Sequence, residues 1–163
     1  MMKQSLIFIA IGIALVGGVL LFASMRTNPT EPIVTDRTTR EVALTCDREM
    51  TQGMHIHPVL EIVVNGEKVP VPENVGIRAT CMTAIHTHTP DGVIHVESPE
   101  KRDFTLGDFF AVWEQPFDKG QVLSYRADAT HRVRMTVDGT EVDTYENTIL
   151  KDGQRIVISY EAI

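Results

Sequence analysis

The chain has 163 residues, of which 43% are hydrophobic, and a formal net charge of −7 at pH 7. This length accommodates one domain of ordinary size together with a shorter segment. Beyond Arg26 the chain keeps 13 of its 15 basic residues and all 22 acidic ones, so this part carries a formal charge of −9. Because proteins that bind nucleic acid or anionic lipid by charge present basic surfaces, this acidic balance argues against both partners.

Residues 4–25 contain no charged side chain and are almost entirely apolar, with Lys3 before them and Arg26 after them. A bilayer core requires about 20 such residues, whereas a signal peptide has an apolar centre of about 7–15 and a small-residue cleavage site. We predict an N-terminal transmembrane anchor over residues 1–26, in preference to a cleaved signal peptide. Either interpretation places the rest of the chain on the extracytoplasmic side, membrane-bound in the first case and secreted in the second.

Residues 27–40 are rich in Thr and Pro and are predicted to be a tether, which leaves 41–163 as an extracytoplasmic domain. This domain contains both cysteines, Cys46 and Cys81. In an oxidising compartment such a pair most often forms a disulfide. The alternative is that Cys81 is a thiolate ligand of copper(I) or zinc, and the spacing leaves both interpretations open.

The next elements are two predicted β-hairpins. In the first, residues 59–71 alternate around Asn65-Gly66, the strongest short hairpin signal, and Ile62 is expected to face Val69. The period of two puts the aliphatic residues on one face and three polar residues on the other: His55, His57 and Glu61.

The second hairpin is expected over residues 79–98, where Thr89-Pro90-Asp91-Gly92 has the composition of a type I turn. Pairing across this turn puts His86 directly opposite His95. Directly opposed residues have Cβ atoms about 4.5–5.5 Å apart, within reach of two imidazoles on one ion. The predicted polar face comprises His86, His88, His95 and Glu97, and the aliphatic residues between them occupy the other face.

Downstream, Thr105 and Asp108 have the spacing of a capping box, and Leu106, Phe109, Phe110 and Trp113 recur at helical spacing, which predicts one short helix packed on the core. The C-terminal third returns to strands, "QVLSYRA", "RVRMTVDGTEV" and "QRIVISYEA". We predict an α+β fold, mostly antiparallel sheet with one short helix. The order of a hairpin, a helix and further strands ending in "LKDGQRIVI" resembles the β-grasp folds of ubiquitin-like and sulfur-carrier proteins, with the His-rich hairpin as an insertion.

The histidines are the candidate functional residues. In a strand, His-x-His directs both rings to one face, so two such pairs on neighbouring strands and a crossing His95 offer up to five imidazole ligands. The predicted metal ligands are His55, His57, His86, His88 and His95. Imidazole suits zinc and copper best. His131 has no partner at useful spacing and is predicted to be structural.

Further residues near these histidines extend the candidate site. Glu61 and Glu97 are candidate ligands, acceptors that orient an imidazole, or general bases beside a metal-bound water. Met54 and Met82, together with Met50, flank the ligand strands, and their soft thioethers favour copper over zinc. The chain contains no phosphate-binding loop, dinucleotide fingerprint, nucleophile elbow or His-Glu-x-x-His motif.

The motifs "MHIHPVLEIVVNGEKVPVPENVGI", "CMTAIHTHTPDGVIHVESP", "FTLGDFFAVW" and "LKDGQRIVISY" occur in order over about residues 44–160. This series resembles a family of small membrane-anchored or secreted prokaryotic proteins without an assigned activity. The resemblance implies that motif positions are occupied by His55, His57, Cys81, His86, His88, His95, Glu97, Ser98 and Pro99. Relatives often have Asp directly after His88; here that residue is Thr89, so the resemblance carries no carboxylate role to this position.

Three functions are compatible with these observations. The first is a membrane-tethered domain that binds a metal ion, copper in preference to zinc, and holds, delivers or senses it. The second is a metalloenzyme in which three histidines leave an open position for water and Glu97 or Glu61 acts as the base. The third is a metal-free adaptor domain that meets a partner protein in the cell envelope.

Overall fold

The computed structural model describes residues 37–48 and 53–163. The predicted anchor over residues 1–26, Met50 and most of the predicted tether therefore lie outside the described residues. None of the helices in the described part is long and apolar enough to cross a membrane. The described residues belong to one compact unit, Arg37–Ile163, which begins before the domain start predicted at residue 41.

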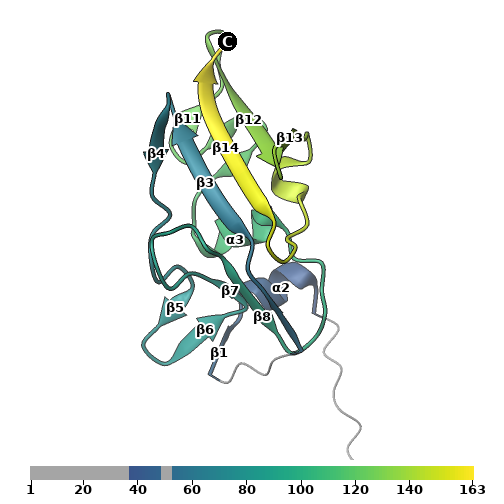
Figure 1. The fold of residues 1–163 in the computed structure, drawn as a ribbon. Coiled ribbons are helices and arrows are strands. Elements are labelled where there is room, and N and C mark those ends of the chain that lie inside the picture. Colours follow the sequence, from purple (N-terminus) through teal and green to yellow (C-terminus); the bar gives the residue numbers. More distant parts are fainter. Residues whose placement is uncertain (1–36, 49–52) are drawn as a thin grey trace, which may run out of the picture. The chain divides into compact units, whose positions relative to one another are not determined.

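The largest sheet has five strands in the order β13-β12-β14-β3-β4. These strands are β3 (Val59–Val64), β4 (Glu67–Val69), β12 (His131–Val137), β13 (Thr140–Glu141) and β14 (Arg155–Ala162). The C-terminal strand β14 lies in the centre, parallel to β3 and antiparallel to β12 (Figure 1). The predicted first hairpin is confirmed, because Asn65 and Gly66 have positive φ and Ile62 pairs with Val69.

Three smaller sheets of three strands accompany it, in the orders β2-β8-β7, β1-β6-β5 and β11-β10-β9. Their strands are β1 (Cys46–Asp47), β2 (Met54–Ile56), β5 (Ile77–Arg78), β6 (Cys81–Thr83), β7 (Ile85–His86), β8 (His95–Ser98), β9 (Phe117–Asp118), β10 (Gln121–Val122) and β11 (Tyr125–Arg126). The stretch "QVLSYRA", predicted as one strand, is instead the tight hairpin β10-β11. The chain reverses there, since Leu123 adopts a positive φ of 52° and Val122 pairs with Tyr125.

The His-rich hairpin has the predicted register, with His86 paired to His95. A hydrogen bond connects the turn of this hairpin to the large sheet: the Leu60 N–H on β3 donates to the Gly92 carbonyl at 2.8 Å. Gly92 has a φ of 86°, and a Cβ atom there would lie 2.2 Å from the Leu60 carbonyl oxygen. Glycine is therefore required at this close approach of two backbones.

Helix α3 (Leu106–Val112) confirms the predicted helix, and Thr105 and Asp108 form the expected capping box. A second helix, α2 (Thr39–Leu44), begins inside the segment predicted as tether, and Thr38 and Glu41 cap it in the same way. It was not predicted because a six-residue helix shows too little apolar periodicity. A short 3-10 helix, η1 (Tyr145–Asn147), precedes β14.

The hydrophobic core gathers side chains from the large sheet, α3 and the His-rich hairpin. Its fully buried members include Leu60, Ile62, Ile85, Ile94, Val96, Phe104, Phe109, Met135, Ile156 and Ile158. The fold is therefore mostly antiparallel sheet with few helices, which agrees with the predicted class. The aliphatic face of the hairpin reaches this core and thereby fixes which way its histidines point.

Candidate metal centre

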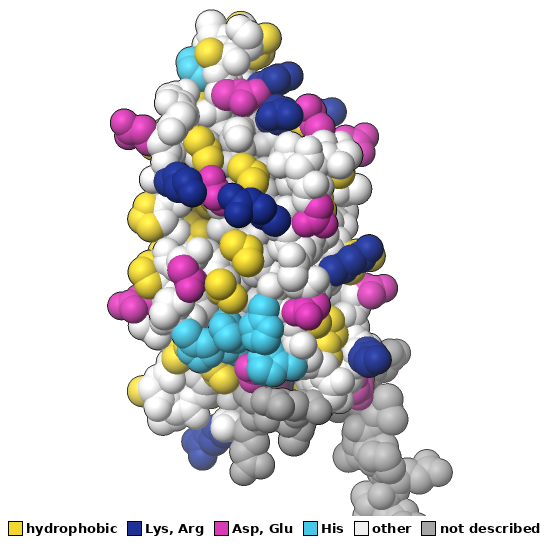
Figure 2. Space-filling model, viewed as in Figure 1, with side chains coloured by type: hydrophobic (Ala, Val, Ile, Leu, Met, Phe, Trp, Pro, Cys, Tyr) yellow, Lys and Arg dark blue, Asp and Glu magenta, His cyan; other side chains and the backbone are white. Residues whose placement is uncertain are grey.

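Five of the six histidines gather on one side of the three-stranded sheet β2-β8-β7. His95 on the central strand β8 pairs with His86 on β7. On the other edge of β8, His55 on β2 pairs with Glu97. A hydrogen bond from the Ile94 N–H to the Pro58 carbonyl extends the pairing of these two chain segments beyond His57. Figure 2 shows the result as a band of histidine side chains on the surface.

His95 lies at the centre of this cluster. Its ring centroid is 4.6 Å from that of His88, 4.7 Å from that of His57 and 5.5 Å from that of His86. Ring nitrogens lie within 4.8 Å of one another in two groups that share His95: an outer triad of His55, His57 and His95, and an inner triad of His86, His88 and His95. Either triad can hold a metal ion.

The inner triad is the more firmly oriented of the two. The fully buried His86 donates from Nδ1 to the Thr83 carbonyl at 3.1 Å, so its lone pair is on Nε2, the atom that would bind an ion. With no ion bound, this lone pair accepts a hydrogen bond from the Nε2–H of His88. Nε2 of His86 lies 3.2 Å from Nε2 of His88. With metal–nitrogen distances of about 2.0–2.1 Å, nitrogens in a tetrahedral site lie about 3.3 Å apart, so the two rings already have ligand spacing.

Thr87, between these two histidines, holds the segment in place. Its hydroxyl donates to the Pro72 carbonyl at 2.7 Å and accepts from the Val75 N–H at 3.1 Å. Its backbone N–H also donates to the Val75 carbonyl. Because Thr87 is fully buried directly after β7, these bonds fix the backbone that carries both flanking imidazoles.

Acidic side chains neighbour the outer triad. Nε2 of His55 lies 3.1 Å from Oε1 of Glu97, and the His57 backbone N–H donates to Asp152 at 2.9 Å. The His55 and His57 side chains are 36% and 42% exposed. Asp152 was not predicted, since it lies 95 residues from His57 in the chain. The outer triad is thus open to solvent and lies beside negative charge.

Nδ1 of His95 is buried and has no hydrogen-bond partner among the described residues. A buried polar atom without a partner costs about 1–3 kcal/mol, and such atoms are rare in folded proteins. Coordination to an ion would satisfy it. This orphaned nitrogen therefore fits the donor set of a metal site better than it fits a set of structural histidines.

Burial keeps two of the rings neutral. The pKa of His86 is lowered to about 4, chiefly by burial and to a smaller extent by the neighbouring His88 and His95, while the Thr83 carbonyl and Glu97 act in the opposite direction. Burial, followed by His88 and His57, also lowers the pKa of His95. Since a metal ion binds the unprotonated imidazole, these two rings are in the ligand form at neutral pH.

The same shift predicts acid sensitivity of the metal-free protein. Since the folded-state pKa of His86 is about 4, below the unfolded value, the unfolded chain binds an extra proton between pH 4 and about 6.5. Stability from this group is present above pH 6.5 and is lost as the pH falls. We compare the unfolding free energies of the wild type and His86→Asn. The amount by which the wild type is more stable should decrease by about 2 kcal/mol between pH 7 and 4.5. Urea unfolding in chelator measures this, and parallel pH profiles would contradict it.

The structure separates several other predicted site residues from the cluster. Cys46 and Cys81 form a disulfide, which confirms that interpretation, and the alternative of a Cys81 thiolate ligand is corrected because neither sulfur is free. Met54 packs against the core beside Ile56, because alternation along β2 turns it away from His55. Met82 lies on β6, where it pairs with Asp47 on β1 and Ile77 on β5.

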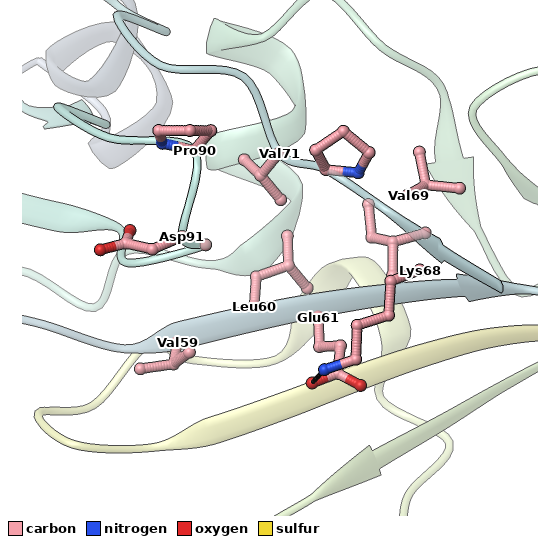
Figure 3. Close-up of a pocket in the computed structure, with 11 residues that line it drawn as sticks. Val59, Leu60, Glu61, Lys68, Val69, Val71, Pro90 and Asp91 are labelled. Carbon is pink, nitrogen blue, oxygen red and sulfur yellow. Dashed lines mark hydrogen bonds and ion pairs between the residues drawn. The ribbon is translucent and has the colours of Figure 1, made fainter.

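Glu61 is occupied elsewhere. Figure 3 shows its carboxylate joined to Lys68 at the rim of a shallow pocket between β3, β4 and the Pro90–Asp91 turn. Oε2 of Glu61 lies 2.9 Å from Lys68 and 2.9 Å from Arg155. Because β3 belongs to the large sheet, the neighbours of Glu61 are β4 and β14. The prediction that Glu61 acts beside the histidines as a ligand, an orienting acceptor or a general base is therefore corrected.

His131, the sixth histidine, lies at the start of β12, far along the chain from the cluster. Its ring stacks on Tyr160 with centroids 5.0 Å apart, and its Nδ1 lies 2.8 Å from the Thr130 hydroxyl. Neither triad includes it. It therefore serves as a natural control for experiments on the cluster.

Comparisons of the chain with protein-family models, with curated proteins and with solved structures found no match.

Proposed function

We propose that this protein is a membrane-tethered, extracytoplasmic metal-binding protein that holds, delivers or senses an ion through its clustered strand histidines. The observation that carries the metal site is the buried, unpartnered Nδ1 of His95, the residue that the two histidine triads share. The tether and the extracytoplasmic location rest on the apolar run of residues 4–25 and on the disulfide.

Copper is the metal we favour, with zinc as the alternative. Soft sulfur donors do not support this preference, because the sulfur of Cys81 is in a disulfide and Met54 packs against the core. The remaining donors are imidazoles, which suit both metals. For a given set of nitrogen ligands, copper(II) binds more tightly than zinc, and this order supports copper.

The arrangement supports binding more than catalysis. A metalloenzyme requires a free base beside a metal-bound water. Glu97, the remaining candidate base, lies 3.1 Å from Nε2 of His55 and is placed to orient that imidazole.

We also propose that the large sheet is β-grasp-like. The hairpin β3-β4, the central parallel pair β3 and β14, and the order β13-β12-β14-β3-β4 support this topology. The His-rich hairpin lies between β4 and α3 in the chain, at the place of an insertion. The likeness concerns the topology of the sheet and carries no activity with it.

The metal content of the purified protein tests the proposed function. The full chain, in mild detergent and without a histidine tag, would be loaded with copper(II) or zinc and dialysed. We expect about one equivalent of copper to be retained, and the same for His131→Ala, because His131 lies outside both triads. Less than about 0.1 equivalent of both metals would contradict the proposal.

A further inference from the structure

The two histidine triads differ in ways that one common site would not require. Their only shared ligand is His95, which lies on the central strand of its sheet. The outer triad draws His55 from the edge strand β2, and the inner triad draws the fully buried His86 from β7. The question is how one shared imidazole serves both.

A neutral imidazole has one lone-pair nitrogen, so His95 binds one ion at a time. Two divalent ions on either side of that ring would also repel each other across a short distance. The overlap of the triads therefore fits two alternative positions for a single ion. An ion moving between them keeps His95 as a ligand while the other two imidazoles are exchanged.

The surroundings give the two positions different roles. The outer triad is partly exposed and lies beside Glu97 and Asp152, whose negative charge attracts a cation. The inner triad is oriented in advance, since the Thr83 carbonyl fixes His86 and the two Nε2 atoms lie 3.2 Å apart. Ligands that need little reorganisation bind more tightly.

We propose, on the basis of the metal-binding function above, that the outer triad captures the ion and the inner triad holds it. The ion reaches the inner position by exchanging His55 and His57 for His86 and His88, with His95 a ligand in both positions, and it leaves by the reverse exchange. No bond other than metal–imidazole bonds forms or breaks, and the oxidation state of the ion is unchanged. The exposed triad is then the position at which an external donor or acceptor of the ion exchanges it.

The test uses the full chain with copper(II) as the probe and two double variants. Rapid mixing measures capture, excess chelator measures release, and equilibrium dialysis measures stoichiometry and Kd. For His55→Gln/His57→Gln, we expect capture and release both to slow by about 10-fold or more, with Kd nearly unchanged. For His86→Asn/His88→Gln, we expect unchanged capture and a Kd weakened by about 100-fold through faster release.

Since His86 is fully buried and His88 is exposed, His88→Gln alone serves as a second inner-triad variant should the double variant not fold. Binding of two equivalents by the wild type would overturn the proposal in favour of two simultaneous sites. A weaker Kd with an unchanged capture rate in the outer-triad variant would also overturn it. Either result leaves metal binding intact, whereas a wild type that retains no metal contradicts the proposed function itself.

Discussion

Replacing His95 with Ala is expected to weaken metal binding by more than about 100-fold, the largest effect of any single histidine substitution. Even the loss of a group that only orients a ligand costs about 10–100-fold in affinity, and His95 is itself a ligand. It is also common to both triads, so its removal leaves two separate pairs of imidazoles. No other histidine has this position.

The contrast with neighbouring histidines makes this expectation specific. His88→Ala leaves the outer triad complete, and His57→Ala leaves the inner triad complete. Each of these variants should therefore retain a three-histidine site and lose less affinity than His95→Ala. Chelator competition on the three variants, with His131→Ala as the matched control, measures the order. Equal losses at His57, His88 and His95 would show that all five histidines act as one site.

The His95→Ala variant also has an expected effect on stability without metal. The substitution removes a buried nitrogen that has no partner in the described structure, and it removes a neighbour that lowers the pKa of His86. Metal-free stability at pH 7 should therefore fall less than for truncation of a well-packed core side chain, which costs about 2–5 kcal/mol. A loss of that size would indicate that packing, not coordination, explains this residue.

The half of the site on the His-rich hairpin could be predicted because its information is local. The composition of the Thr89–Gly92 turn sets the register, and the alternation of Ile94 and Val96 with His95 sets the face. A shift of one residue in the pairing register would have turned the imidazoles toward the core and the aliphatic side chains toward solvent. Short-range turn chemistry and burial were sufficient here.

The acidic surroundings of the site depend on which strands become neighbours in the fold. Residues far apart in the sequence decide this, so short stretches of sequence do not reveal it. The alternation of the sequence predicted that Glu61 shares a face with His57. In the structure β3 pairs with β14 in the large sheet, and the Glu61 carboxylate forms ion pairs with Arg155 and Lys68. Asp152 arrives at His57 from the turn before β14. The contacts of Arg155 with Glu61 and of Asp152 with His57 have no signal in the sequence, because both follow from the central position of the C-terminal strand.

Removing the disulfide is the second change with a large expected effect. The bond closes a loop of 35 residues, and the loss of that constraint is expected to cost about 4 kcal/mol of unfolding free energy. We expect this loss for Cys46→Ser/Cys81→Ser in urea unfolding of the metal-free protein. A reductant should lower the stability of the wild type and leave the double variant unchanged, which separates the disulfide from other effects of the substitutions.

The same double variant should bind metal more weakly, because a single residue, Thr83, connects the disulfide with the inner triad. Cys46 is the strand partner of Thr83, and the Thr83 carbonyl accepts the hydrogen bond from Nδ1 of His86. If that carbonyl is less firmly placed, the buried imidazole loses its orientation, and affinity should fall by about 10-fold. The effect should vanish in the His86→Asn background, where there is no ring to orient. An undiminished effect in that background would mean that the disulfide acts on the cluster by another route.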